Sequence, residues 1–164
     1  EIIGQGPLEK ELCTQIDRLD LQNCVKLLGA KPQHEIAEHL AAGTVFVLPS
    51  VIGPDGGMDN LPTVIMEAMA SGLPVVSTAI AGIPEMVVEN ETGVLVPASD
   101  AGALARAIEK VIVDPSFARH LGENGHKRAC ELFSINKNVR SLIQIFEELV
   151  DSEVGQIKVD RGHN

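Results

Sequence analysis

The sequence has no tryptophan and no tyrosine, and phenylalanine occurs only four times in 164 residues. Proteins that bind single-stranded nucleic acid stack its bases on aromatic side chains, and proteins that bind duplexes neutralise the phosphates with lysine and arginine. The formal net charge of this chain is -10. Because the sequence offers neither aromatic platforms nor a cationic excess, we expect no nucleic acid partner.

Cysteine is also scarce, since Cys13, Cys24 and Cys130 are odd in number and widely spaced. This pattern is typical of a reducing compartment rather than of a disulfide framework, and it predicts a cytoplasmic protein. No apolar run approaches the length of a membrane-spanning helix, so we expect no transmembrane segment. A hydrophobic content of 45% in 164 residues is sufficient for the core of one globular domain.

Short β-branched runs alternate with segments of helical periodicity, which is typical of an α/β fold. We therefore expect a Rossmann-like three-layer sandwich with a parallel sheet. The expected strands are residues 2–3, 25–28, 45–50, 74–78 and 93–96, and the expected helices are 8–19, 33–42, 59–71, 85–88, 101–113, 116–130 and 135–150. The domain would span residues 1–150, followed by a polar tail at 151–164.

The most informative segment is the strand at 45–50, the glycine-rich loop that follows it, and the next helix. Glycines suit a backbone that approaches a ligand closely, and Asp59 or Asn60 is a good N-cap for the helix. Pro62 suits the first turn, and Gly72 is the expected C-cap. The N–H groups at such a helix start form an anion site for which phosphate is the natural ligand. The residues expected around that anion are Asn60, Leu61 and Thr63.

Asp59 and Glu67 are eight residues apart, which corresponds to about 12 Å along a helix. An ionised carboxylate has two acceptor oxygens and no donor, so it suits a pair of neighbouring hydroxyl groups. A nucleotide diphosphate sugar has this layout, with Glu67 binding the ribose and Asp59 the sugar. The structural alternatives are an N-cap role for Asp59 and a packing role for Glu67. We favour function for Glu67 because a buried acid in an apolar helix needs a partner.

Lysine and arginine are absent between Pro32 and Ala105, and all 13 of them lie outside that segment. The proposed phosphate site lies inside it. Backbone N–H groups must therefore supply most of the local stabilisation of an anion, or cations must come from elsewhere. Leu28 ends a predicted strand, and Gly29 and Lys31 follow it. Because α/β sheets bind ligands at the carboxyl ends of their strands, we expect these three residues to line the nucleotide base.

Three other motifs allow more than one interpretation. Gly4 and Gly6 do not complete a dinucleotide fingerprint, because Glu9 stands at the third glycine position, and a tight turn explains them equally well. His34 and His39 are five residues apart, about 140° round a helix, whereas a zinc-binding helix needs a spacing of four. We interpret the two histidines as part of a solvated face and expect no metal. Glu85 is either a helix-start carboxylate or a ligand contact, and both interpretations stay open.

One pattern in the chain consists of an acidic residue, seven further residues, the string EAMASGLPVV and then GIPE. It resembles the donor-binding half of retaining glycosyltransferases of family 4, which have the GT-B fold. The longer string SVIGPDGGMDNLPTVIMEAMASGLPVVST is similar to the exopolysaccharide subset, including colanic-acid-type enzymes. The resemblance covers about residues 2–150. It implies that Asp59 lies by the donor sugar and Glu67 holds the ribose, and it places Gly4 and Gly6 near the donor. The family usually has Glu where this chain has Asp59 and often Gly where it has Asn60.

The resemblance also implies an activity, which is transfer of a hexose with retention of anomeric configuration. The donor would be a UDP-sugar or GDP-sugar, the acceptor a polysaccharide or a lipid-linked glycan, and no metal cofactor would be needed. By the same resemblance, an N-terminal acceptor-binding domain and the first strand with its basic residues are missing, so this chain alone would be inactive and bind its donor weakly. Peripheral membrane association of the full-length enzyme stays open. The alternatives are a nucleotide-sugar epimerase of the same fold and a non-catalytic nucleotide-sugar or glycan binding module.

Overall fold

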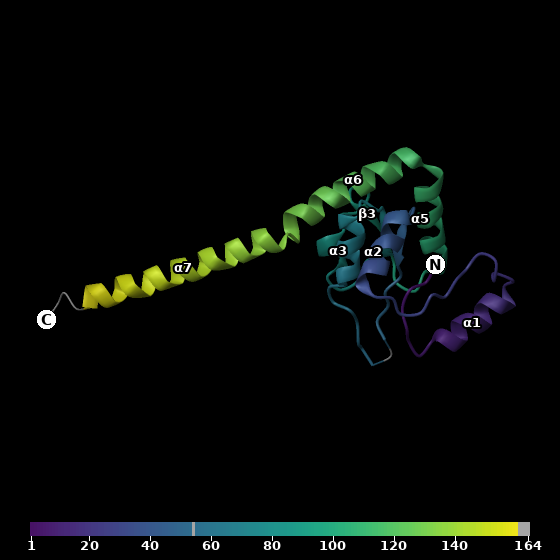
Figure 1. Ribbon diagram of the computed structural model, residues 1–164, viewed down its shortest axis with the longest axis horizontal. Coiled ribbons are helices and arrows are strands. Elements are labelled where there is room, and N and C mark those ends of the chain that lie inside the picture. The colour runs from purple at the N-terminus through teal and green to yellow at the C-terminus, as the bar shows by residue number, and fades with distance from the viewer. Residues whose placement is uncertain (54, 161–164) are drawn as a thin grey trace. The chain divides into compact units, whose positions relative to one another are not determined.

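The computed structural model describes residues 1–53 and 55–160. The chain forms two compact units, of which the first is Glu1–Gly43 and the second begins at Thr44 (Figure 1). Helices and parallel strands alternate along the second unit, which confirms the predicted α/β class. None of the helices in the described ranges combines the length and the apolar character that crossing a bilayer requires.

The first unit contains the helices α1 (Glu9–Arg18) and α2 (Gln33–Ala42), close to the predicted bounds. The strands predicted at 2–3 and 25–28 are shorter than expected, because Ile2 and Leu27 form a single parallel bridge. The N–H of Ile2 donates to the oxygen of Lys26 at 2.8 Å, and the N–H of Leu28 donates to the oxygen of Ile2 at 2.9 Å. Gly4 has a φ of 144° and turns the chain soon after Ile2, which limits the pairing.

The sheet of the second unit has the order β1 (Phe46–Leu48), β2 (Val75–Thr78), β3 (Gly93–Val96), and both pairs are parallel. Val76 on the central strand lies in register with Val47 on one side and Val94 on the other. All four residues of β2 are buried, as expected for a parallel strand covered on both faces. The predicted strand centres are correct, and β1 is shorter than the predicted 45–50.

Three helices cover this sheet: α3 (Thr63–Ala70), α5 (Ala101–Val113) and α6 (Pro115–Leu132). A short helix, α4 (Ile83–Met86), begins two residues earlier than predicted. The buried side chains of the sheet, α5 and α6 form one core cluster, which contains Val76, Val94, Val96, Ala107, Val111 and Leu121. This cluster lies where β2, β3, α5 and α6 meet, and the buried side chains of Ile65 and Met69 on α3 and of Ile83 and Met86 on α4 form a further part of the core.

Helices α3 and α6 pack closely against each other (Figure 1). The C-cap of α3 is Ser71 rather than the predicted Gly72, which follows it with a φ of 74°. The N–H of Leu73 donates to the oxygen of Ala68 at 3.1 Å, so this glycine still closes the end of the helix. A Cβ atom on Gly122 of α6 would lie 2.2 Å from the oxygen of Gly72. Only a glycine lets the two backbones approach this closely.

Helix α7 (Ile135–Asp160) follows α6 after the link formed by Phe133 and Ser134. The sequence predicts that this helix ends at residue 150 and that a polar tail begins at 151. The predicted helix end is wrong, because α7 continues to Asp160. The extension contains Glu153, Gln156 and Lys158, which are good helix formers although the segment is polar. Residues 161–164 of the predicted tail lie outside the described residues.

The start of α6 gives a prediction for the pH dependence of stability. Asp114 Oδ1 accepts hydrogen bonds from the Ser116 hydroxyl at 2.6 Å and from the N–H of Phe117 at 3.0 Å. The side-chain hydrogen bond from Ser116, followed by the backbone bond from Phe117, holds the pKa of Asp114 below its usual value of 3.8. Because the pKa is lower in the folded than in the unfolded chain, the carboxylate stabilises the fold above pH 3.8 and loses this effect as the pH falls through the folded-state pKa.

The measurement is urea unfolding of the wild type and of Asp114→Asn from neutral pH to below the usual carboxyl pKa. Asparagine is also a good N-cap but does not titrate in this range, so it is the matched control for the charge. We expect the stability advantage of the wild type over Asp114→Asn to shrink with falling pH. A difference between the two proteins that does not change with pH would contradict this assignment.

Candidate functional site

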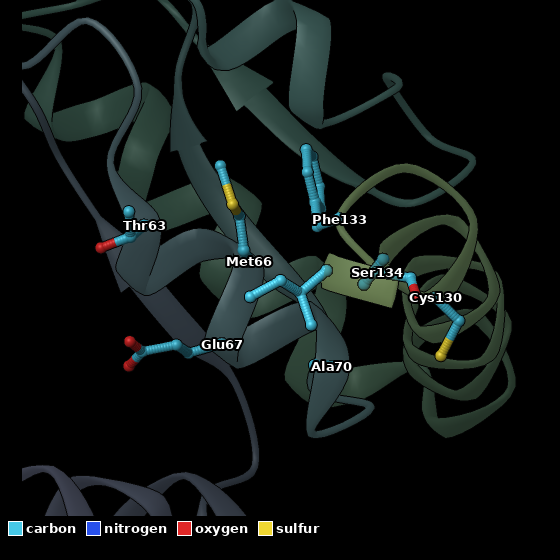
Figure 2. A pocket seen from close by; sticks show the side chains of 9 residues that line it. Thr63, Met66, Glu67, Ala70, Cys130, Phe133 and Ser134 are labelled. Atoms are coloured by element: carbon cyan, nitrogen blue, oxygen red, sulfur yellow. The ribbon is translucent and has the colours of Figure 1, made fainter. Parts of the chain in front are cut away.

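The two predicted ligand-binding side chains of α3, Thr63 and Glu67, lie on one face of the helix, because they are four residues apart. Both line a pocket of about 530 Å³. Figure 2 shows the Thr63 hydroxyl and the Glu67 carboxylate extending on the same side of α3, whereas Met66 extends on another side. The rest of the lining comes mainly from the end of α6 and the link to α7: Met66, Ala70, Ala129, Cys130, Phe133, Ser134 and Ile135.

Glu67 is partly exposed, so the prediction that its helix buries the carboxylate is wrong. The core-facing positions of α3 are Ile65, Ala68 and Met69, which have the spacing of one helix face, and Glu67 falls outside that stripe. Among the described residues, no side chain donates a hydrogen bond to the Glu67 carboxylate. The structure therefore presents a carboxylate that is available to a ligand, rather than one that requires a partner because it is buried.

The start of α3 differs from the prediction in a way that affects the expected anion site. The helix begins at Thr63 rather than at Asp59 or Asn60, with Pro62 in an extended conformation before it. A residue that precedes proline is disfavoured in the helical region, so Leu61 cannot extend the helix backwards. Asp59 Oδ1 instead accepts a hydrogen bond from the N–H of Leu61 at 3.2 Å.

This correction changes which groups can bind an anion. Asn60 and Leu61 precede α3, and the N–H of Leu61 is already used by Asp59. The N–H groups at the helix start belong to Thr63 and the residue after it. The distance of about 12 Å along one helix does not describe the separation of Asp59 and Glu67, because Asp59 lies before the helix. Asp59, Asn60 and Leu61 are also not among the residues that line the pocket.

The glycine-rich loop between β1 and α3 is organised by one of its own side chains. Asp55 Oδ1 accepts a hydrogen bond from the N–H of Gly57 at 3.0 Å, and the N–H of Gly53 donates to the oxygen of Gly57 at 2.8 Å. A Cβ on Gly53 would lie 2.7 Å from Asp55 Oδ1. The Asp55 carboxylate therefore fills the space that the missing side chains of these glycines leave open. Pro54 lies outside the described residues.

Two hydroxyl groups at the end of β2 fix the point where this loop leaves the sheet. The Ser77 hydroxyl donates to the oxygen of Leu48 at 2.7 Å, and the Thr78 hydroxyl donates to the oxygen of Ser50 at 2.7 Å. Both side chains are buried. Sequence reasoning did not identify them, although two hydroxyl residues at the end of an apolar strand were a signal, because buried hydroxyl groups need hydrogen-bond partners.

The remaining predicted contacts belong to the first unit. The N–H of Gly4 donates to the oxygen of Gly29 at 2.9 Å, so these two residues lie together, whereas Gly6 is exposed in the following turn. Lys31 Nζ forms an ion pair with Glu35 Oε2 at 2.8 Å. Leu28 is partly buried beside them in the chain. Contact of Leu28, Gly29 and Lys31 with a nucleotide base stays a prediction.

The sequence allows His34 and His39 to be metal ligands or part of a solvated face. Among the described residues, neither belongs to a group that could hold a metal ion. His39 Nδ1 lies 2.9 Å from Glu1 Oε2, and His34 is exposed. Among the side chains that the structure describes, in residues 1–53 and 55–150, no group of three His, Cys, Asp or Glu residues is placed so that it could hold a metal ion. Glu85 is exposed in the first turn of α4, so its side chain is accessible to solvent.

Comparisons with known proteins agree with this architecture. The chain is 40% identical over 147 residues to WcaL of Salmonella typhimurium, a protein provisionally named a colanic acid biosynthesis glycosyltransferase, and covers 36% of it. These 147 residues are 87% of this chain. It is also 52% identical over 104 residues to the amylovoran biosynthesis glycosyltransferase AmsK of Erwinia amylovora. The aligned residues cover 63% of this chain and 26% of AmsK. The chain thus spans about a third or less of the length of these relatives.

Solved structures show the same fold. Sucrose-phosphate synthase from Thermosynechococcus elongatus matches 92% of this chain with a TM-score of 0.77 and 31% identity, over 38% of that protein. HepE from Anabaena, in complex with UDP-glucose, matches 89% of this chain with a TM-score of 0.77 and 27% identity, over 40% of HepE. The family described as glycosyl transferases group 1 matches residues 1–128. With its parallel sheet and its GT-B structural relatives, the chain belongs to the group 1 glycosyl transferase family.

Proposed function

We propose that this chain is the donor-binding part of a glycosyltransferase that uses a nucleotide diphosphate sugar in exopolysaccharide synthesis. The observation that carries the proposal is the available carboxylate of Glu67, one helical turn from Thr63 at the start of α3. The assignment of a nucleotide sugar is supported by family membership and by HepE, which has been crystallised with UDP and with UDP-glucose. The biosynthetic names of WcaL and AmsK support an exopolysaccharide product.

Each group in this site has a defined chemical role in the proposal. Glu67 accepts hydrogen bonds from the two ribose hydroxyl groups with its two carboxylate oxygens. The first N–H groups of α3 and the Thr63 hydroxyl stabilise the diphosphate, which is the leaving group when the sugar is transferred. Because no lysine or arginine occurs between Pro32 and Ala105, further cations come from other parts of the complete protein.

Asp59 is assigned to the sugar end of the donor. Its Oδ1 atom is used by the N–H of Leu61, and in the described part of the chain no donor contacts Oδ2. The second oxygen can therefore accept a hydrogen bond from a sugar hydroxyl. We propose a hexose as the transferred sugar and retention of its anomeric configuration, without a resident metal ion. We propose that the acceptor is a polysaccharide or a lipid-linked glycan, and that it binds to a part of the complete protein outside this chain. The enzyme would act in the cytoplasm.

Titration of the chain with UDP-glucose, UDP and GDP-mannose, followed by amide NMR, tests the donor site. We expect millimolar binding that selectively shifts the amide signals of Thr63, Val64 and Glu67. The wild-type chain with AMP is the control for unspecific phosphate binding. Absence of shifts on α3 with every diphosphate, or equal shifts with AMP, would contradict the proposal.

Product analysis with the complete protein separates the proposed reaction from the alternatives. A glycosyltransferase consumes the donor only when an acceptor glycan is present, and the anomeric configuration of the product can be read by NMR. Conversion of the sugar nucleotide without an acceptor would favour an epimerase. Binding without turnover would favour a binding module. Activity that persists after chelation of metals is the expected result for a donor site without a resident metal.

A further inference from the structure

A backbone contact ties the loop before α4 to the loop before α3. The N–H of Gly82 donates a hydrogen bond to the oxygen of Asn60 at 2.9 Å. Asn60 and Leu61 lie immediately before Pro62 and the start of α3. The contact therefore holds the short segment from which the first turn of α3 begins.

Space, rather than backbone conformation, requires a glycine at position 82. The φ of Gly82 is -82°, a value that any residue adopts. A Cβ at this position, however, would lie 2.4 Å from the oxygen of Asn60 and 3.3 Å from Leu61 Cδ1. A side chain of any size at position 82 would thus displace the peptide between Asn60 and Leu61.

The other end of α4 is held by α6. Arg128 Nε donates to the oxygen of Met86 at 2.8 Å, and Arg128 Nη2 donates to the oxygen of Glu85 at 2.7 Å. Ile83 and Met86 are buried, so α4 is also fixed by packing. Gly82 therefore presents its N–H to Asn60 from a short element that is anchored at its far end.

We propose that Gly82 and Arg128 are positioning residues of the donor site. Gly82 sets the place of Asn60 and Leu61, and through them the place of the N–H groups of Thr63 and Val64, while Arg128 holds α4 so that Gly82 stays in contact. Neither residue touches the donor in this assignment. The inference rests on the proposed function, because it concerns how the same site is held ready for a nucleotide diphosphate.

The test compares Gly82→Ala with Gly122→Ala in the NMR titration with UDP-glucose. Gly122→Ala is a matched control, because its added Cβ also meets a backbone oxygen, that of Gly72, but at the opposite end of α3. We expect both variants to lower the thermal unfolding midpoint. Only Gly82→Ala should weaken UDP-glucose binding, by about tenfold, and shift the Thr63 and Val64 amide signals before ligand is added.

Arg128→Gln keeps the inference testable if Gly82→Ala does not fold. It adds no atom near Asn60 and removes the paired hydrogen bonds to α4, so we expect about threefold weaker UDP-glucose binding. Wild-type affinity in the folded Gly82→Ala variant, or in Arg128→Gln when Gly82→Ala is unfolded, would overturn this inference and leave the proposed function intact. If the wild-type chain itself gave no UDP-glucose shifts, both would fall.

Discussion

Replacing Glu67 with glutamine should weaken UDP-glucose binding by about ten- to a hundredfold, because each hydrogen bond to a charged group contributes about 1.5–3 kcal/mol. Glutamine has nearly the same shape, but it has one acceptor oxygen and a donor group where the carboxylate has two acceptors. It cannot accept from two neighbouring ribose hydroxyls in the same way. Calorimetric or NMR titration of the wild type and the variant measures the ratio of dissociation constants.

A packing role for Glu67 would predict that Glu67→Gln lowers the thermal unfolding midpoint and leaves binding unchanged. The binding role predicts the reverse. Because the carboxylate is partly exposed and has no donor side chain among the described residues, Glu67→Gln should leave the thermal unfolding midpoint nearly unchanged. Glu123→Gln, an exposed position on α6, is the matched control and should affect neither binding nor stability. Unchanged UDP-glucose affinity in Glu67→Gln would contradict the assignment of this residue to the ribose.

The second large effect is expected in the core, where Leu121→Ala should lower the free energy of unfolding by about 2–5 kcal/mol. Leu121 is completely buried on α6 and packs in the cluster with Val76, Val94 and Val111. Truncation removes apolar contacts and leaves a cavity that the sheet and α5 cannot readily fill. Urea unfolding followed by circular dichroism measures the difference.

The control for Leu121 lies on the same helix. Leu132 is 44% exposed whereas Leu121 is fully buried, so Leu132→Ala removes the same atoms with a smaller loss of buried surface. Its expected cost is about 1 kcal/mol, because about half of the transfer free energy of a leucine side chain is lost and no enclosed cavity forms. Equal destabilisation by the two substitutions would mean that Leu121 does not belong to a core cluster where β2, β3, α5 and α6 meet.

Sequence reasoning predicted most accurately those elements whose local signals agree with each other. The helix predicted at 101–113 matches α5 at both ends, and in the structure Asp100 caps its start by accepting a hydrogen bond from the N–H of Ala103. The strand predicted at 93–96 coincides with β3. In both places the apolar pattern and the flanking turn favour the same boundaries, and α5 also has a capping residue at its start.

The start of α3 was predicted less well because two local rules compete there. Asp59 and Asn60 are good N-caps, but Pro62 disfavours the helical conformation for the residue before it. The second effect prevails, and the Asp59 carboxylate satisfies the N–H of Leu61 instead. A reading centred on the proline would have placed the helix start correctly.

The exposure of Glu67 could also have been inferred from the sequence. Ile65, Ala68 and Met69 already define the buried stripe of α3, and Glu67 lies about 100° away from its neighbours in the helix. What the sequence could not reveal is the pocket itself, because it depends on Phe133 and Ser134, which lie more than sixty positions further along the chain.

The close approach of Gly122 to Gly72 links the dynamics of two helices that are distant in sequence. The Nδ1 atom of His126 also lies 2.7 Å from the oxygen of Ala70, and since a carbonyl only accepts, His126 is the donor. Because α6 is held in this way against the last turn of α3, local opening of either helix would expose the other, and we expect the two to open as one cooperative unit. We expect a nucleotide that stabilises the first turn of α3 to slow hydrogen exchange along α6 as well, including the middle of α6 around Gly122.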